Sequence, residues 1–438
     1  MSKESSLDAS FKDGIFASLM LGFSTNYITP FAMLLGANNF YVGLLNSIPQ
    51  IFGSAIQLKS TEIVNTIKSR VKAITLTVFL QASTLIMACL IFLLPKELHV
   101  GIFIFLIVLN AVFGSMAAPA WLSLISDTAD KNKYGEYFAW RGKVFGFIVL
   151  ISNFVAGFLL FIIPNKIIGF VILFLLAGVC RIISGIFLGK MDDIPVEKSG
   201  KADFSYFQFI KRISESNFTK FVLFVSLMNF ATYLSAPFFA VYMLNDLKFK
   251  YSTYTIIKSA SALSALISLP FWGRLADKYG NVKVIKSSAL LLPLVPILWI
   301  FSKNPVYLII VDSFGGYAWA GFNLAVVNFI FDSSSCEVRT RCASYFNFTN
   351  GTCIFLGAII GGYLATHMPA LIFSSILLTL FFVSGAARFL VNIFMLGKFH
   401  EVRNAEAIGD LKIFNMILGI APVLNLGEEI YNRKNKQN

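Results

Sequence analysis

Long apolar runs separated by shorter polar gaps dominate the chain. Twelve runs approach or exceed the ~20 residues that a helix needs to cross the hydrocarbon core of a bilayer. Barrel strands are excluded, because they are only about ten residues long and alternate in polarity. We therefore predict an all-α polytopic membrane protein. The predicted spans are 13–35, 40–58, 73–94, 100–125, 144–163, 166–189, 219–243, 253–272, 284–302, 305–331, 344–364 and 369–397.

The gaps between the runs alternate in length and charge. Odd-numbered gaps are short, whereas even-numbered gaps are longer and basic. Most of the 36 Lys and Arg residues lie in the termini and the even-numbered gaps. The positive-inside rule therefore predicts cytoplasmic termini. The three Asn-x-Thr sequons, at Asn217, Asn347 and Asn350, fall in positions predicted to be cytoplasmic or buried, and the lack of an external sequon favours a bacterial inner (plasma) membrane. The cations predicted on the opposite side are Lys96, Lys166, Lys248, Lys250, Lys258 and Lys303.

The longest internal gap divides the twelve runs into two groups of six. We predict a cytoplasmic N-terminus at 1–12, an N-terminal six-helix bundle at 13–189, a central cytoplasmic loop at 190–218, a C-terminal six-helix bundle at 219–397 and a cytoplasmic tail at 398–438. The tail contains one apolar patch that is too short to span, and we expect it to be interfacial or docked.

The two groups of runs are similar to each other. At an offset of 205 positions, glycines 146 and 157 coincide with glycines 351 and 362, and at 207 the arginines 181 and 388 coincide. Glycines allow close helix approach in membranes. Two copies in the same orientation are the parallel-repeat plan of many carriers, with the solute site between the halves.

A loop motif in the second half carries a family resemblance. Residues 273–283 read GRLADKYGNVK, which resembles the loop signature of the major facilitator superfamily (MFS), although Asn281 and Val282 depart from its basic pair. The corresponding stretch of the first half, 59–72, lacks the glycines and the acidic core of the signature. The resemblance implies two pseudo-symmetric six-helix bundles, the MFS fold, and a carrier that works by alternating access.

The motif also implies a cytoplasmic latch. Gly273 is expected to let its helix end against a neighbour, and Gly280 to permit a tight turn. Asp277, next to Lys278, would offer a carboxylate to a helix N-terminus or an arginine. The expected partners are Arg339 and Arg341. The alternative is that all six are ordinary turn and topology residues.

Ionisable residues within the predicted spans are few. Asp312 is the only acid that we place clearly inside the apolar zone, and Lys258 lies at similar depth. We expect the two to pair, with Asp312 as the coupling candidate for a proton or a cation. The alternatives are a static packing pair or two groups in a wet vestibule. Arg181 and Arg388 are expected to snorkel to the headgroups.

The resemblance implies a cavity lined mainly by helices 1, 2, 4, 5, 7, 8, 10 and 11. Its candidate residues are mid-helix polar or aromatic side chains, each of which has an interhelical hydrogen bond as its alternative role. They are Asn26, Tyr27, Asn46, Gln50, Asn110, Asn153, Asn229, Tyr233, Trp319 and Asn323. Prolines at 30 and 237 predict bends beside this site. Because the set is rich in amides and poor in carboxylates, it favours a neutral or anionic solute.

Composition narrows the function further. Only 13% of the residues are charged, about half the proportion of a soluble globular protein. The cations are scattered between apolar runs, which argues against nucleic acid as a partner. The sequence lacks a phosphate loop, paired catalytic carboxylates and a His/Cys cluster, so we predict no enzyme, no metal and no cofactor.

These observations predict a monomeric secondary active transporter of a small solute, coupled to a proton or another ion. Its partners would be the solute, the coupling ion and the lipid bilayer. One alternative is a transport-inactive MFS-like receptor or assembly protein. The other is a lipid-translocating member of the family.

Overall fold

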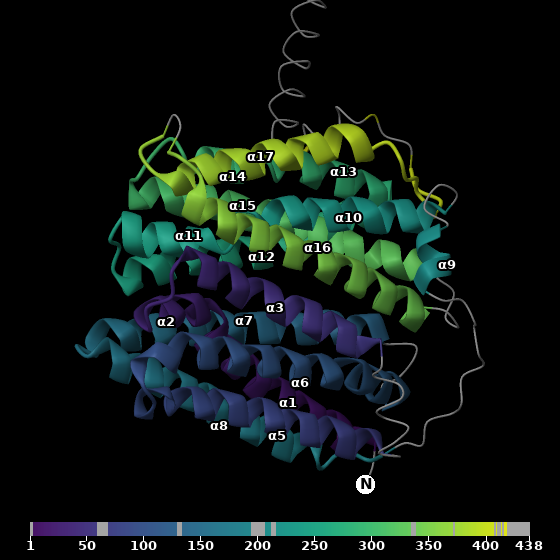
Figure 1. Ribbon diagram of the computed structural model, residues 1–438. Helices are drawn as coiled ribbons and strands as arrows, with labels where there is room; N and C mark the ends of the chain where they lie inside the picture. The colour runs from purple at the N-terminus through teal and green to yellow at the C-terminus, as the bar shows by residue number, and fades with distance from the viewer. Residues whose placement is uncertain are drawn as a thin grey trace, which may run out of the picture.

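The computed structural model describes the chain from residue 3 to residue 406, with gaps at 59–68, 129–133, 194–205, 212–215, 334–338 and 371–372, together with residues 409, 413, 416 and 417 of the tail. All regular secondary structure in these residues is helical. The helices form two layered groups, which we call the N-half and the C-half (Figure 1).

The N-half contains six long segments. In chain order they are α1 (Lys3–Ser24) with η1 (Thr25–Tyr27) and α2 (Ile28–Leu34), α3 (Asn39–Gln57), α5 (Arg70–Cys89) with η2 (Ile91–Leu93) and η3 (Lys96–Leu98), α6 (His99–Thr128), α7 (Tyr134–Ile162) and α8 (Lys166–Leu188).

The C-half repeats this arrangement after the short helix α9 (Tyr206–Lys211). Its segments are α10 (Asn217–Tyr233) with α11 (Phe238–Val241) and η5 (Tyr242–Asp246), α12 (Tyr251–Tyr279), α13 (Asn281–Leu291) with α14 (Leu294–Leu298), α15 (Pro305–Asp332), α16 (Arg339–His367) and α17 (Ile376–Met395).

The two ends of the bundle differ. The first residues of α1 and the longer connections lie at one end, which we call the terminal face; α2, α11 and α14 lie at the other, the far face (Figure 1). Large apolar side chains on the flanks are exposed, among them Phe158 at 61%, Ile267 at 70% and Phe394 at 65%. An apolar flank of this kind needs lipid around it.

Ten segments of the described chain are long and apolar enough to cross a membrane. The protein is therefore an integral membrane protein, and the predicted all-α polytopic class is confirmed. The other two predicted spans correspond to α1 with α2, and to α3. Both form helices. In α3, the polar side chains of Asn46, Gln50 and Gln57 lower the mean hydropathy, and they serve the interior of the bundle.

Three of the predicted spans are broken where prolines occur. The first changes to a 3-10 turn at Thr25–Tyr27, just before Pro30, and the seventh breaks directly before Pro237. Proline has no N–H for the carbonyl four residues earlier. The carbonyl that Pro30 leaves free, at Asn26, accepts a hydrogen bond from the Tyr254 hydroxyl at 2.7 Å. The predicted bends at Pro30 and Pro237 are therefore present.

The ninth span breaks at Pro293, and α17 satisfies the carbonyls that its prolines leave free. Asn392 Nδ2 donates to the Ala289 carbonyl at 2.7 Å, four residues before Pro293. Arg388 Nη1 donates to the Leu292 carbonyl at 3.0 Å, four residues before a second proline. The expectation that Arg388 snorkels is therefore wrong: its side chain is 2% exposed and points into the C-half.

The glycines that reveal the sequence repeat are where the two halves pack together. In the N-half, a Cβ on Gly157 would lie 2.4 Å from the Thr255 hydroxyl of α12. The matching glycine of α16 is Gly362. A Cβ on Gly362 would lie 3.2 Å from the Gly43 Cα of α3. The repeat therefore relates the α7–α12 contact to the α16–α3 contact, as expected for two pseudo-symmetric bundles.

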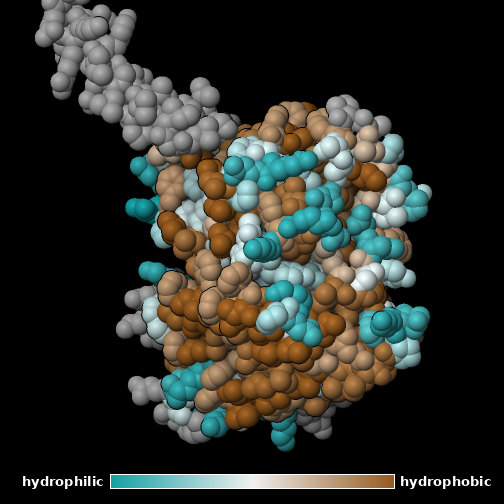
Figure 2. All heavy atoms as spheres, turned by 90° about the vertical axis from the view of Figure 1, so that its left-hand side faces the viewer, coloured by the Kyte–Doolittle hydropathy of each residue, from teal (hydrophilic) through white to brown (hydrophobic). Residues whose placement is uncertain are grey.

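The surface of the far face differs between the halves. Apolar side chains cover most of the N-half on this face, whereas hydrophilic side chains gather over the C-half (Figure 2). Leu93, Leu98 and Phe161 are among the exposed apolar residues of the N-half end, and Lys250 and Lys303 are exposed on the C-half.

Candidate transport site

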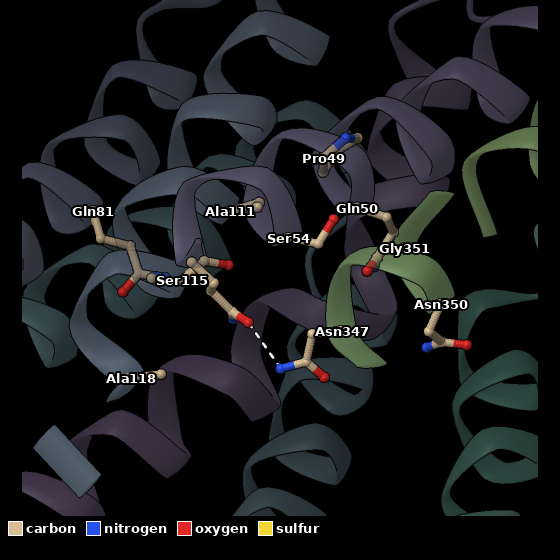
Figure 3. A pocket seen from close by; sticks show the side chains of 13 residues that line it. Pro49, Gln50, Ser54, Gln81, Ala111, Ser115, Ala118, Asn347, Asn350 and Gly351 are labelled. Carbon is tan, nitrogen blue, oxygen red and sulfur yellow. Dashed lines mark hydrogen bonds between the residues drawn. The ribbon is translucent and has the colours of Figure 1, made fainter. Parts of the chain in front are cut away.

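A polar cavity of about 380 Å³ lies between the halves (Figure 3). It is closer to the terminal face, because its walls use the end of α3 and the beginning of α16. Its volume is at the lower end of the range for small-ligand pockets. The residues that line it are Pro49, Gln50, Gly53, Ser54, Gln57, Gln81, Ala111, Gly114, Ser115, Ala118, Asn347, Asn350 and Gly351.

The walls combine small residues with amides and hydroxyls. Gln81 and Asn350 lie on opposite sides of the cavity, with Ser115 between them (Figure 3). Among the described residues that line it, none is charged or aromatic. Asn347 Nδ2 donates to Gln57 Oε1 at 2.8 Å, so one amide pair joins α16 to α3 directly.

A second polar group, which we call the far-side cluster, joins the halves closer to the far face. It contains Asn26, Tyr27, Asn153, Thr255 and Ser259. The Tyr27 hydroxyl donates to the Asn153 carbonyl at 2.8 Å and lies 2.9 Å from the Thr255 hydroxyl. Asn153 Nδ2 donates to the Ser259 hydroxyl at 2.7 Å, and Asn26 donates to Asn153 at 3.1 Å. Tyr27 is completely buried, so this cluster is part of a closed contact.

The predicted pair of Asp312 and Lys258 is in contact. Lys258 Nζ lies 3.3 Å from both carboxylate oxygens of Asp312, and the side chains are 25% and 10% exposed respectively. The pair joins α12 to α15 within the C-half. Lys258 also directly precedes Ser259, which places the pair beside the far-side cluster.

The N-half contains a second buried acid that the sequence reading missed. Asp13 is 4% exposed and accepts a hydrogen bond from the Ser184 hydroxyl at 2.6 Å. Arg181 donates to Ser184 at 3.0 Å and, through Nε, to Gln81 Oε1 at 2.8 Å. Arg181 therefore points into the bundle, and the expectation that it snorkels is wrong. Asp13 was missed because α1 begins at Lys3, ten residues before the predicted span.

Of the predicted cavity residues, only Gln50 lines the cavity. Two others support wall residues from behind: Asn229 donates to Asn350 at 2.8 Å, and Asn110 accepts from Gln81 at 3.3 Å. Asn26, Tyr27 and Asn153 form the far-side cluster instead. Asn46 bonds within its own helix and to Thr29, whereas Tyr233, Trp319 and Asn323 do not reach the walls.

One cavity wall comes from a helix that the resemblance did not include. Gln81 belongs to α5, the third long segment of the N-half, and reaches the cavity beside Gly114. A Cβ on Gly114 would lie 2.7 Å from Gln81 Nε2. One feature of the sequence could have indicated that Gln81 reaches the cavity: Gly114 on α6, which leaves room for the Gln81 amide.

The loop between α12 and α13 turns where the motif predicts. Gly280 has φ +89°, a conformation that side chains rarely adopt. The Val282 N–H donates to Glu401 Oε2 at 2.8 Å, so a carboxylate does cap the N-terminus of α13. That carboxylate belongs to the segment after α17, however, and not to Asp277.

Other parts of the expected latch are not brought together in the described residues. Asp277 is exposed, with no ion-pair partner there. Lys278 lies 3.6 Å from Glu406. The side chains of Arg339 and Arg341 lie outside the described residues. Gly273 is inside α12, where a Cβ would meet only Leu324 at 4.0 Å, so close packing does not explain it.

Two more expectations concern parts of the chain that are only partly described. The gap at 59–68 covers most of the first-half loop, and the central loop is described only in part. In the tail, Ile413 is 1% exposed and the Ile417 carbonyl accepts from the Tyr317 hydroxyl at 2.7 Å. These two positions are docked on the C-half.

Comparison with known proteins shows which family and which structures the chain resembles. The structure resembles that of the nucleoside transporter NupG with a TM-score of 0.71 at 16% sequence identity, covering 90% of this chain and 100% of that one. A family model described as Major Facilitator Superfamily matches residues 221–412. The sequence of the C-half therefore resembles this family, and the chain as a whole has the MFS fold. None of the curated proteins matches its sequence.

Two other solved structures of transporters have the same MFS fold. The D-xylose-proton symporter has a TM-score of 0.68 at 11% identity, covering 92% of this chain and 99% of that one. A bacterial homologue of the iron transporter ferroportin, in an inward-facing state, has a TM-score of 0.66 at 14% identity, covering 90% and 98%. Their identities are low, so the likeness is one of fold.

Proposed function

We propose that this protein is a secondary transporter of the major facilitator superfamily that carries a small solute by alternating access. One observation carries the proposal: a polar cavity lies at the interface of two bundles related by the repeat, among helices whose outer surfaces are apolar. A polar void at this depth is costly unless it serves a hydrophilic solute or its hydration. The position between the halves is where parallel-repeat carriers hold their solutes.

The orientation follows from charge. With the terminal face in the cytoplasm of a bacterial cell, the cavity lies on the cytoplasmic side of the far-side cluster. The cluster and the Gly43–Gly362 approach then close the route to the outside. The described conformation would therefore be inward-facing.

Asp312 and Lys258 are the coupling candidates. Protonation of Asp312, or binding of a cation there, would release Lys258 from its ion pair. Because Lys258 is next to Ser259 on α12, its movement would act on the hydrogen bond from Asn153 across the interface. Breaking the Asp312–Lys258 ion pair inside the C-half would thus weaken the Asn153–Ser259 hydrogen bond between the halves.

Solute counterflow in proteoliposomes tests the proposal. Purified protein should give transient accumulation of labelled solute against an excess of the same solute loaded inside. Gly351→Leu is the blocked variant, since Gly351 lines the cavity and a Cβ there would already meet the Ser54 hydroxyl of the adjoining wall helix α3. Gly101→Leu is the matched control, because nothing lies within 4 Å of its Cβ position.

Two results would contradict the proposal. In one, the folded protein exchanges none of the small solutes tested; in the other, the Gly351→Leu variant exchanges them as well as the parent protein does. Silence across all solutes would favour the receptor or assembly function. Movement of labelled lipid in place of solute would favour a lipid-translocating protein.

A further inference from the structure

The chemistry of the cavity walls limits what the cavity can hold. The polar wall groups include five amides, at Gln50, Gln57, Gln81, Asn347 and Asn350, and none of the described wall residues carries a charge. An ion placed there would lose water without meeting a counter-charge, which is unfavourable. The wall residues that the structure describes also include no aromatic ring on which a flat base or drug would stack.

The amides present both donors and acceptors to the cavity. Asn350 uses its oxygen to accept from Asn229 Nδ2, which leaves its own NH₂ group for a solute. Asn347 donates its NH₂ to Gln57, which leaves its oxygen. A hydroxyl group donates one hydrogen bond and accepts others, so paired donors and acceptors suit it.

One of these amides is held in a fixed orientation. Arg181 Nε donates to Gln81 Oε1 at 2.8 Å, and a bond from a cation is stronger than a neutral one. The Gln81 amide nitrogen is therefore turned toward Asn110 Oδ1, 3.3 Å away, and toward the space left by Gly114. Asp13 lies close to Arg181, because both residues bond to Ser184, and it also lies 4.0 Å from Arg141.

The size of the cavity gives the scale of the solute. Its volume of about 380 Å³ equals that of about a dozen liquid waters at ~30 Å³ each. A monosaccharide or cyclic polyol, with about a dozen non-hydrogen atoms, fits such a space with a few waters.

We propose that the cavity binds an uncharged, hydroxyl-rich solute of monosaccharide size, that Gln81 selects it, and that Arg181 is a positioning residue that fixes the Gln81 amide. This rests on the proposed function, since the same cavity is the transport site. It adds the class of solute and the wall that recognises it.

A solute panel tests the class. Proteoliposomes would be loaded in turn with aldohexoses, pentoses, hexitols and inositol, and with acetate, choline, an amino acid and uridine as the charged or aromatic set. The proposal expects counterflow, and a raised melting temperature of the purified protein, with a member of the first set only. Exchange confined to the second set would overturn the solute class while the carrier function stood. Absence of exchange and of melting shifts with all of them would overturn the proposed function itself.

Variants test the two residues, with the best neutral solute as the probe. Gln81→Leu should raise KM about tenfold with Vmax little changed, because one hydrogen bond to the solute is lost. Arg181→Lys keeps the positive charge near Asp13 but loses the Nε donor, and should raise KM similarly. The double variant should be no worse than Gln81→Leu alone, because both changes act through one amide.

The matched control is Thr352→Val. Thr352 follows the wall residue Gly351 on α16, but its hydroxyl donates within its own helix, to the Phe348 carbonyl. Its KM should equal that of the parent protein. An unchanged KM in Gln81→Leu would refute the selecting role, and additive effects in the double variant would refute positioning by Arg181.

Discussion

Closure of the far side depends on a glycine contact between α3 and α16. A Cβ at Gly43 would lie 2.7 Å from the Ala358 carbonyl oxygen and 3.0 Å from the Gly362 Cα, both backbone atoms. Gly43→Val must therefore push the helices apart toward the 3.4 Å at which ordinary contact begins. Overpacking of this kind destabilises a structure by about 1–3 kcal/mol. It would destabilise only the conformation whose far side is closed, because only there do the two helices touch. The population open to the far face should rise by about 5- to 150-fold.

Cysteine accessibility measures this shift. Thr255 is 3% exposed in the far-side cluster, so a Thr255→Cys reporter in a cysteine-free background should react slowly with a membrane-impermeant maleimide added from the far side. Gly43→Val should increase that rate in proportion to the open population. Gly101→Val, with nothing within 4 Å of its Cβ position, should leave it unchanged. An unchanged or lower rate in Gly43→Val would refute the reasoning that this contact closes the far side.

Three further predictions test other parts of the account. Asp312→Asn should abolish concentrative uptake driven by a proton or cation gradient but preserve counterflow; loss of both would argue against a coupling role. Gln57→Ala removes the amide contact with Asn347. The rate at which a reagent added from the terminal face labels the cavity should therefore exceed the rate in the parent protein. Asn392→Leu leaves the buried Ala289 carbonyl without its donor, and should destabilise the protein by about 1–3 kcal/mol, seen as a lower melting temperature; an unchanged melting temperature would show that the proline break needs no donor.

Much of the fold could be predicted from the sequence because lipid imposes length and polarity on every span. The twelve runs, the bends at Pro30 and Pro237 and the glycine repeat all depend on local sequence or on the copy relationship. The two weaker signals were the span of α1 with α2 and the span of α3, and the amides of α3 are in fact a mark of the cavity. The Asp312–Lys258 contact was predictable because equal depth on neighbouring helices restricts the available partners.

The partners of buried polar groups were less predictable. Arg181 and Arg388 are equivalent in the repeat, yet one bonds to Gln81 and the other to a carbonyl freed by proline. Which way a helix is rotated decides such contacts, and a single apolar run does not encode its rotation. Gln81 was missed for the same reason, and Glu401 because its capping contact joins segments 119 residues apart.

The central claim is that two bundles move relative to each other around one cavity. Distances between spin labels in lipid nanodiscs test it most directly, with one pair of labels at Leu94 and Lys303 across the far face and another at Lys190 and Lys398 across the terminal face. The account predicts that Gly43→Val lengthens the far-face distance and shortens the terminal-face distance. Two distances that stay fixed, or that lengthen together, would contradict it.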